Sequence, residues 1–339
     1  MHSKYFNPKY IVGAYTTSPN LFTWDSITEK KYFNGLKSLD YLSGLELPFW
    51  GYGCHPFDDK WLLSNLDPSW ENILTCIPGT TKFIEKNPSF GISSKNHEIR
   101  KKSIQFYKRA FNCVSELKDK FGSHCVKSIS LASAPGPKKE FNKGNSKYFH
   151  ESLCEISSWD WDSTKLSIEH CDALSLVNPN PQKGYLPLDE EINAIKIINN
   201  SYEKKIGVII NWGRSAIEGK NPEHVLKHLR LCRKEKLLSG IIFSGTTSSN
   251  DNLYGAWSDL HMPPCVFKDY QHFEKDSLMT YDEIKKSLYH SDYINLEIIG
   301  LKLHLLPQSA SINDRIGLNK SMISILNEAI KSLELKKIN

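Results

Sequence analysis

The sequence lacks the marks of membrane proteins and of disordered chains. It contains no run of 18 apolar residues, the length that a membrane-spanning helix requires. Hydrophobic residues make up 40% of the 339 residues and charged residues 24%, whereas disordered chains are poorer in apolar residues. We therefore expect a globular fold and no association with a membrane.

A strong excess of positive charge is also absent. Lys and Arg number 43 against 38 Asp and Glu, which gives a formal net charge of +5. The basic residues are dispersed, and the longest clusters, such as 100–102, hold only two or three of them. Because proteins that bind nucleic acid usually gather basic residues on one surface, we expect no nucleic-acid partner.

Cysteines are few and widely spaced. The eight of them occur singly, without a Cys-x-x-Cys pair, which favours reduced thiols over disulfide bonds or a structural zinc site. The first eight residues lead to a strand-like run without an apolar signal segment. Both features predict a cytoplasmic protein.

Short β-rich runs alternate with segments of helical period along the chain. The runs predict strands at 10–15, 44–49, 73–77, 126–131, 165–169, 207–211 and 240–243, and an eighth within 293–304. Pro78 and Gly79 are expected to stop the third strand. Helices are predicted at 26–42, 95–120, 148–157, 188–199 and about 312–335, and two more from Asn221 and from the capping box 280–283.

Eight strands that alternate with helices indicate an α/β protein with a parallel sheet. Closure into a single (β/α)₈ TIM barrel is the economical arrangement, and an open doubly wound sheet is the alternative. No Gly-x-Gly-x-x-Gly follows the first strand, which weakens the dinucleotide-binding form of that alternative. No linker is evident, so we predict one TIM-barrel domain over residues 1–339.

In a barrel the functional residues gather at the carboxyl ends of the strands. The fifth predicted strand ends in Glu169, His170, Cys171 and Asp172. Side-chain alternation sends Glu169 toward the pocket and His170 toward the rim or the surrounding layer. A carboxylate at this place can bind a cation or remove a proton from carbon. Its structural alternative is a buried Glu paired with a neighbouring Arg or Lys.

The sixth predicted strand ends in a second polar run. Asn211 offers an amide, Trp212 a flat apolar face for a sugar, and Arg214 a guanidinium suited to a carboxylate, a phosphate or a developing enolate. Alternatively, Arg214 braces the strand ends by pairing with a carboxylate such as Glu46.

The long connection after the seventh strand carries weaker candidates. Asp259 and His261 could reach the pocket as part of a lid, and Trp257 could stack on a carbohydrate. Lys302 or His304 would stand at the end of the eighth strand. Loop surface, or core packing for the tryptophan, is the structural alternative.

One pair of histidines has the spacing of a metal site on a helix. His224 and His228 lie four residues apart, but the motif is not His-Glu-x-x-His. Their helix belongs to the outer ring of a barrel, so we expect both side chains to be solvated.

Several segments resemble the xylose-isomerase-like TIM barrels, and more closely a branch of that superfamily known as a domain of unknown function. The segments that carry the resemblance are 44–49, 77–80, 166–172, 210–219, 254–257 and the helix that contains Arg315. The resemblance covers nearly the whole chain. It implies the barrel fold and a sugar or sugar-acid isomerase or epimerase.

The chain departs from that family at the metal ligands. Metal-dependent members carry a carboxylate on the fifth strand, Asp-x-x-His on the sixth, His on the seventh and Glu on the eighth. Glu169 matches, but the sixth strand carries Asn211 and Arg214, and the seventh carries Ser244. A tight site for a divalent metal such as Mn, Mg, Co or Zn is therefore doubtful, and no cofactor is assured.

The register of the eighth strand decides whether a second acidic ligand survives. If the strand ends at Glu297, that carboxylate joins Glu169 as a metal ligand. If it continues further, Lys302 and His304 take the strand end instead.

Isomerisation or epimerisation needs a base beside a carbonyl and an electrophile that stabilises the enediolate. Glu169 is the predicted base, and Arg214 with Lys302 is the predicted electrophile in place of a metal. His170 and Asp172 would orient groups or shuttle protons. The residues expected to bind substrate are Glu46, Asn211, Trp212, Trp257, Asp259, His261 and His304.

Two other functions stay open at this point. Lys302 could form a Schiff base in a lyase or aldolase, or the barrel could bind a sugar without converting it. In each case the expected partner is a small carbohydrate or sugar acid. The sequence leaves the oligomeric state open, a homo-oligomer included.

Overall fold

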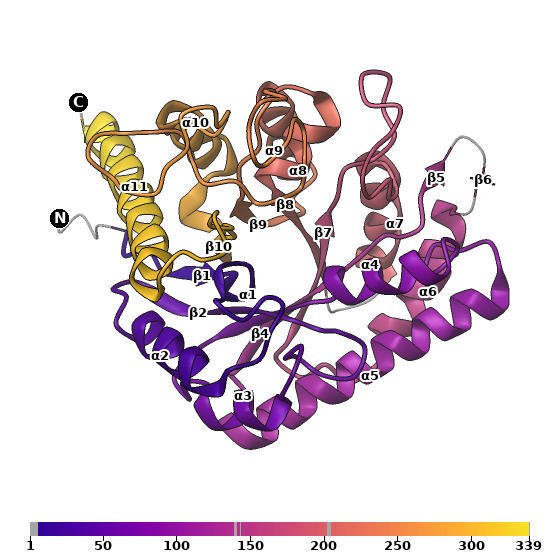
Figure 1. Cartoon of the computed structure of the whole chain (residues 1–339). Helices are drawn as coiled ribbons and strands as arrows, with labels where there is room; N and C mark the ends of the chain where they lie inside the picture. The colour runs from indigo at the N-terminus through magenta and orange to yellow at the C-terminus, as the bar shows by residue number, and fades with distance from the viewer. Residues whose placement is uncertain (1–5, 139–140, 143, 202–204, 339) are drawn as a thin grey trace.

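Eight parallel strands form a closed barrel (Figure 1) in the computed structural model, which describes residues 6–138, 141–142, 144–201 and 205–338. Their order around the barrel is β1-β10-β9-β8-β7-β4-β3-β2. The strands are β1 (Tyr10–Val12), β2 (Leu42–Pro48), β3 (Asn72–Thr75), β4 (Val126–Leu131), β7 (Lys165–His170), β8 (Ile206–Asn211), β9 (Leu238–Phe243) and β10 (Ile298–Leu301). The predicted (β/α)₈ barrel is confirmed, and the open sheet is excluded.

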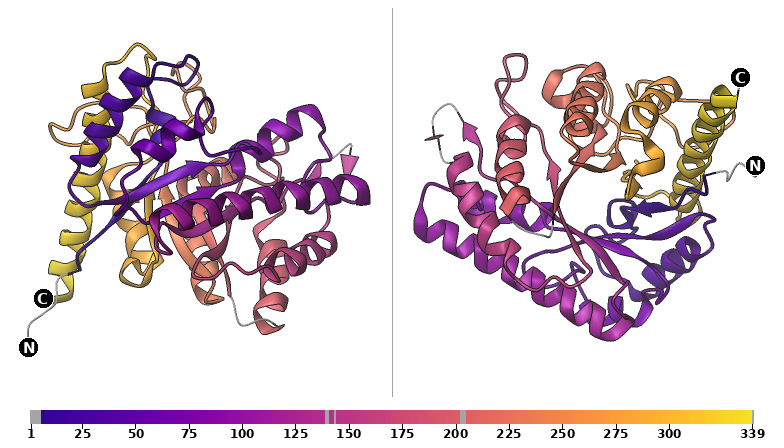
Figure 2. Two further views of the ribbon diagram at one scale, coloured as in Figure 1. Left: turned by 90° about the horizontal axis from the view of Figure 1, so that it is seen from below. Right: turned by 180° about the vertical axis from the view of Figure 1, so that it is seen from behind.

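Helices surround the barrel (Figures 1 and 2). They are α1 (Ala14–Thr17), α2 (Ser26–Lys37), α3 (Asp59–Asn65), α4 (Ile77–Lys86), α5 (His97–Phe121), α6 (Ser146–Ser157), α7 (Leu188–Ser201), α8 (Trp212–Gly219), α9 (Glu223–Lys234), α10 (Tyr281–Ser291) and α11 (Ile312–Ile338). A 3₁₀ turn, η1 (Tyr293–Asn295), precedes β10, and a small antiparallel pair, β5 (Pro137–Lys138) and β6 (Phe141–Asn142), lies after β4. Helix α11 packs against both α2 and α10, which closes the outer ring.

Two helix starts differ from the prediction. Strand β3 ends at Thr75, and Pro78 lies in the first turn of α4, where its missing N–H leaves no helical hydrogen bond unmade. Pro78 therefore opens a helix and does not simply stop a strand. Helix α8 begins at Trp212, directly after β8, and the side chain of Asn211 caps it by accepting a hydrogen bond from the backbone N–H of Arg214.

The long helix α5 follows its predicted apolar stripe. Its N-terminus is capped by Asn96, whose side chain accepts from the backbone N–H of Ile99, and it ends at Gly122, which has a φ of +99°. Tyr107 and Val114 are buried against the barrel. This helix packs as part of the outer hydrophobic layer, between the sheet and solvent.

The lumen of the barrel is filled in layers by residues that alternate along each strand. One layer is a hydrophobic cluster separate from the outer core, made of Ile11, Ile73, Ile209, Ile242 and Ile298. Asn211 follows Ile209 by two residues and Lys302 follows Ile298 by four. Because side chains alternate along a strand, Asn211 and Lys302 point to the same side of the sheet as these isoleucines. The apolar layer thus forms a floor beneath polar residues at the carboxyl ends of the strands.

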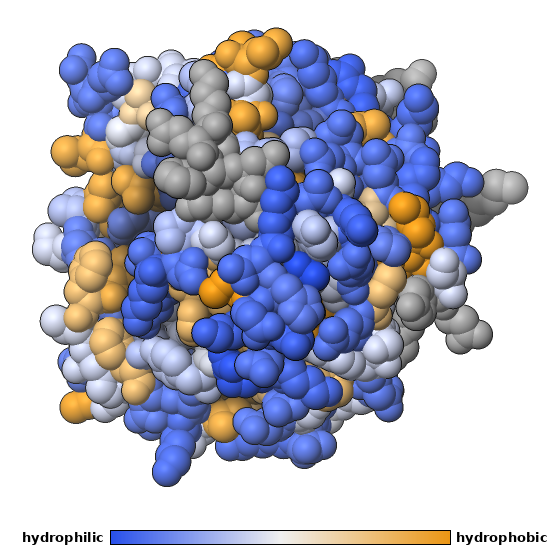
Figure 3. Space-filling model, turned by 90° about the vertical axis from the view of Figure 1, so that its right-hand side faces the viewer, coloured by the Kyte–Doolittle hydropathy of each residue, from blue (hydrophilic) through white to orange (hydrophobic). Residues whose placement is uncertain are grey.

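The surface has the mixed character of an ordinary globular protein. Figure 3 shows one side of the molecule, where hydrophilic residues predominate and hydrophobic ones appear as separate spots. Within the described part of the chain, no helix combines the length and the apolar character needed to cross a membrane.

We expect Ile209→Ala to lower the free energy of unfolding by about 2–5 kcal/mol, because it leaves a cavity in the lumenal layer. Ile209→Val is the matched control and should cost only about 0.5–1.5 kcal/mol. Urea denaturation followed by circular dichroism measures both. Equal losses in the two variants would show that the lumen repacks freely and that this layer does not brace the strands.

Candidate functional site

A cavity of about 280 Å³ lies at the carboxyl ends of β1, β2 and β10. It combines aromatic faces with ionisable side chains, among them Tyr15, Trp50, Glu46, Asp259, His261 and His304. Four of these residues, Glu46, Asp259, His261 and His304, were predicted to bind substrate. The cavity is at the small end of the range for ligand pockets, which suits a small molecule.

A buried lysine directly follows β10 and pairs with a carboxylate that lines this cavity. Strand β10 runs to Leu301, so Lys302 is the next residue, and its side chain is fully buried. Its Nζ donates to Oε1 of Glu46 at 3.1 Å, lies 3.0 Å from Oε2 of the same carboxylate and 3.9 Å from Oε1 of Glu169. A Cβ at Gly13 would come within 2.9 Å of Lys302 Cγ, so the lysine needs a glycine beside it.

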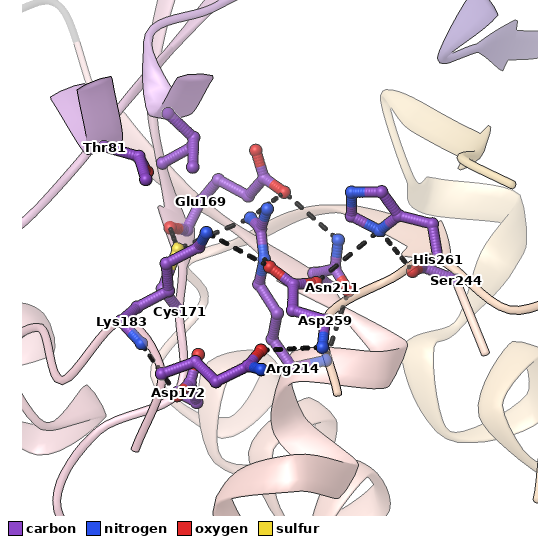
Figure 4. A network of polar contacts seen from close by, with 12 residues as sticks. Thr81, Glu169, Cys171, Asp172, Lys183, Asn211, Arg214, Ser244, Asp259 and His261 are labelled. Atoms are coloured by element: carbon purple, nitrogen blue, oxygen red, sulfur yellow. Dashed lines mark hydrogen bonds and ion pairs between the residues drawn. The ribbon is translucent and has the colours of Figure 1, made fainter. Parts of the chain in front are cut away.

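A buried arginine links two further carboxylates (Figure 4). Arg214, from the first turn of α8, donates through Nη1 to Oε1 of Glu169 at 2.6 Å and through Nε to Oδ2 of Asp259 at 3.0 Å. Nζ of Lys183 lies 3.5 Å from the same Asp259 oxygen. The alternative in which Arg214 pairs with a barrel carboxylate is thus observed, but the carboxylate is Glu169 and not Glu46, which pairs with Lys302.

These residues form a charge cluster with equal numbers of opposite charges. The carboxylates are those of Glu46, Glu169 and Asp259, and the cations are Lys183, Arg214 and Lys302. Buried charges are tolerated only when such partners and hydrogen bonds satisfy them. We refer to these six residues below as the charge cluster.

Glu169 is held as a fixed anion within the charge cluster. Besides Arg214, it accepts hydrogen bonds from Nδ2 of Asn211 at 3.2 Å and Oγ1 of Thr75 at 3.3 Å. Burial alone would raise its pKa, but Lys302 and Arg214 outweigh burial and hold the pKa of Glu169 below its usual value. A carboxylate this well satisfied has little tendency to accept a proton.

Glu46 has the opposite character. Burial raises the pKa of Glu46 to about 7, with Lys302 opposing the rise and Glu169 adding to it. Unlike Glu169, it lines the cavity. Glu46 can therefore exchange a proton near neutral pH at a position that a ligand reaches.

The segment after β9 brings a histidine to the cavity through strained backbone. Trp257 and His261 have φ values of +53° and +55°, which L residues rarely adopt. Nδ1 of His261 lies 2.8 Å from Oγ of Ser244 and 3.5 Å from Oδ1 of Asp259. Burial lowers the pKa of His261 well below its usual value although Asp259 opposes it, so the imidazole is neutral.

Several predicted site residues lie elsewhere. Trp212 is fully buried in α8 and donates from Nε1 to Oγ of Ser287 at 3.1 Å, so its ring presents no face to a sugar. Trp257 packs under Nζ of Lys220, 5.3 Å from the ring centroid, and is not among the residues that line the cavity.

His170 points out of the barrel. Its Nδ1 lies 2.8 Å from Oε2 of Glu191 and its Nε2 lies 3.0 Å from Oε2 of Glu218. Burial opposes the charged imidazolium, but the two carboxylates outweigh it and raise the pKa of His170 to about 10. The side chain therefore lies outside the lumen, in the rim or surrounding layer, as strand alternation predicted.

Two expectations about outlying residues are wrong. His228 is buried rather than solvated, and His224 is partly buried, because Glu218 of α8 packs over this face of α9. Glu297 precedes β10 and pairs with Lys165 at 2.5 Å at the opposite end of the barrel. It therefore cannot share a metal ion with Glu169.

Three functional candidates escaped the sequence analysis: Lys183, Glu191 and Glu218. Lys183 lies in an irregular connection, where spacing predicts nothing. Glu191 is one of three acidic residues at the start of α7, and Glu218 lies within the segment 210–219 that carries the resemblance.

The strand ends do not fit the divalent metal ion that the fold implies. Among the residues at the ligand positions of the metal-dependent barrels only Glu169 is a carboxylate, and it is already paired with Arg214. Ser244 is a weak ligand, and the ammonium of Lys302 would repel a cation.

Comparison with known proteins identifies the relatives of this chain. A family described as domain of unknown function DUF4862 matches residues 11–318. The Uncharacterized protein STM3670 of Salmonella typhimurium (strain LT2) is 32% identical over 327 residues, which cover 96% of this chain and 99% of that protein.

Solved structures share the fold at much lower identity. The IOLI protein, in a structure with a zinc atom, has a TM-score of 0.58 at 10% identity and covers 95% of this chain and 99% of its own. A fusion of a xylose isomerase-like TIM barrel with 4-hydroxyphenylpyruvate dioxygenase has a TM-score of 0.57 at 8% identity. The match covers 97% of this chain and 44% of the fusion protein. The 3-keto-D-glucoside 4-epimerase YcjR from E. coli has a TM-score of 0.53 at 13% identity. The match covers 94% of this chain and 100% of the epimerase. The chain thus shares its barrel fold with these proteins.

We expect Arg214→Met to lower the free energy of unfolding by about 3–5 kcal/mol, because it leaves Glu169 and Asp259 buried without their guanidinium. Lys165→Met is the control, since it breaks the exposed pair with Glu297 and should cost less than about 1 kcal/mol. Urea denaturation compares them. Similar small losses would mean that water or Lys183 replaces the arginine.

Proposed function

We propose that this chain, which belongs to the family described as domain of unknown function DUF4862, is a sugar or sugar-acid isomerase or epimerase that works without a metal at its strand ends. The observation that carries the proposal is the ion pair between Glu46, which lines the cavity, and the buried Lys302 behind it. One member exchanges a proton near neutral pH, and the other supplies a fixed positive charge.

Proton transfer beside a carbonyl needs both of these properties. Glu46 acts as the base that removes the proton from carbon, because its pKa is about 7 and it lines the cavity. Lys302, 3.0 Å from that carboxylate, stabilises the negative charge that develops on the substrate oxygen. In metal-dependent relatives of the fold a metal ion would supply this stabilisation.

Glu169, which the sequence suggested as the base, has a different role in this proposal. It is fully buried and accepts hydrogen bonds from three side chains, so it acts as the counter-ion that keeps Arg214 and Lys302 charged and in place. Arg214 remains part of the predicted electrophile, because it adds its positive charge to the charge cluster.

His261 offers a second proton carrier at the same cavity. Its imidazole is neutral, and Ser244 and Asp259 orient it through Nδ1. Epimerisation returns the proton from the opposite face of the carbon, which requires a second group, whereas isomerisation between neighbouring carbons needs only one. A cavity with both Glu46 and His261 allows either reaction.

The ligand class follows from the lining of the cavity. Tyr15 and Trp50 provide flat faces on which sugar C–H groups can pack, and His304 and Asp259 provide polar contacts. The fold is shared with the 3-keto-D-glucoside 4-epimerase. A small carbohydrate or sugar acid suits these surroundings.

The Schiff-base alternative has less support. It requires a neutral amine, and although burial alone would lower the pKa of Lys302, Glu169 and Glu46 outweigh burial and raise it. The ammonium form is therefore favoured over the nucleophilic amine.

We expect the protein to exchange a C–H proton beside the carbonyl of its substrate with solvent, and Glu46→Gln to slow that exchange by about 10²–10⁴-fold. The measurement is deuterium incorporation by NMR when a panel of aldoses, ketoses and sugar acids is incubated with protein in D₂O. Glu297→Gln, at the other end of the barrel, is the matched control and should exchange at the wild-type rate.

Retained exchange in Glu46→Gln would remove Glu46 as the base. If no sugar exchanges but one raises the melting temperature, the barrel binds without converting its ligand, and the enzyme proposal fails.

The rate should also depend on pH in a defined direction. Because the base must be unprotonated, exchange should rise as the pH passes through about 7, the pKa of Glu46. Lys302 lowers that pKa, so Lys302→Met should slow exchange and move the rise to higher pH. Profiles of exchange rate against pH for both proteins test this. An unmoved profile in Lys302→Met would assign the titration to another group.

A further inference from the structure

Outside the barrel, three histidines converge on one buried glutamate. His170 is the last residue of β7, Glu218 lies in α8, and His224 and His228 lie four residues apart in α9. We call these four residues the histidine cluster. It is separate from the charge cluster, because His170 and Glu169 point to opposite faces of β7.

The three histidines of the cluster each bring one ring nitrogen close to the carboxylate of Glu218. Nε2 of His170 is 3.0 Å from Oε2 of Glu218, and Nε2 of His224 and of His228 are 3.5 and 3.6 Å from Oε1. Ligand atoms of His170, Glu218 and His228 all lie within 4.8 Å of one another. His224 is not part of that group, although its Nε2 is near Oε1 of Glu218, so its side chain has to move toward the other three to join them around one ion. Four donors at about 2.0–2.1 Å from a tetrahedral zinc ion stand roughly 3.3 Å apart.

The outer nitrogens of two histidines have the partners that metal-binding imidazoles usually have. Nδ1 of His170 lies 2.8 Å from Oε2 of Glu191, and Nδ1 of His228 lies 3.0 Å from Oγ of Ser215. A carboxylate or hydroxyl at this nitrogen fixes the ring and leaves Nε2 as the ligand atom. Both Nε2 atoms accordingly face Glu218.

Two features of the cluster favour a bound cation. Nε2 of His224 is buried and makes no hydrogen bond within the described structure. Glu191 and Glu218 bring two buried carboxylates to one imidazole, His170. A divalent cation bound to neutral imidazoles would balance those two negative charges and give Nε2 of His224 a closer contact than the carboxylate oxygen 3.5 Å away.

We propose that His170, Glu218, His224 and His228 hold one zinc ion in a structural site outside the barrel. Three imidazole nitrogens and a carboxylate are a donor set that suits zinc, whereas Mg²⁺ and Ca²⁺ prefer oxygen ligands. The ion takes the place of the proton between His170 and Glu218. With four protein donors the site is closed, so it ties β7, α8 and α9 together and takes no part in catalysis.

Metal content of the full-length protein tests the proposal. The purified chain is stripped with a chelator, incubated with an equimolar amount of Zn²⁺, desalted and analysed by mass spectrometry; we expect about one zinc per chain. Co²⁺ should give the visible absorption of a tetrahedral site. His228→Gln and His224→Gln should lower the affinity for Zn²⁺ at least tenfold, and Ser215→Ala about tenfold through the lost outer partner.

Glu169→Gln is the matched control, because it changes the carboxylate next to His170 on the other face of β7 and should keep the zinc. Loss of zinc in Glu169→Gln with retention in His228→Gln would overturn the proposal and place a metal in the lumen. A wild-type chain that binds no Zn²⁺ would overturn it as well. His224 lies partly exposed at the edge, so His224→Gln keeps the test valid if His228→Gln fails to fold. Sugar exchange plays no part in these readouts, so they are independent of the proposed function.

Discussion

The contact between Arg214 and Glu169 is the interaction on which the rest of the site depends. A carboxylate buried in the lumen at the carboxyl ends of the strands has lost its water, and only a cation with hydrogen bonds of good geometry compensates for that loss. The guanidinium provides this at 2.6 Å and also reaches Asp259. It can do so because α8 starts immediately after β8, which places the first helical turn over the lumen.

The replacements at the strand ends make sense only as a set. A metal-dependent barrel gathers carboxylates and histidines around a divalent cation, and removal of the ion would leave unpaired negative charge. Here Arg214 and Lys302 bring the positive charge on side chains, and Asn211 keeps a polar group without a further anion. Arginine stays charged at any relevant pH, so the cluster always keeps this positive charge. A bound metal ion, in contrast, would be present only when the metal is available.

Much of this arrangement could be predicted from the period of the sequence. Alternation in β7 put Glu169 inside and His170 outside, and the strand ends supplied Arg214 and Lys302 as candidates. The register of β10 could not be predicted, because apolar residues extend on both sides of it. It is set by pairing with β9, where Ile298 opposes Gly240 and Leu301 opposes Phe243. That pairing puts Glu297 and Lys302 at opposite ends of the barrel.

The environment of α9 shows why burial of a helix face is harder to predict than its period. An outer-ring helix normally turns its polar face to water, and nothing within α9 marks His228 as an exception. The exception is made by α8, an extra helix between β8 and α9 that carries Glu218 over that face. Because β7 carries Glu169 on one face and His170 on the other, the two clusters share one strand end. Any force that fixes His170 therefore also fixes the backbone from which Glu169 reaches Arg214.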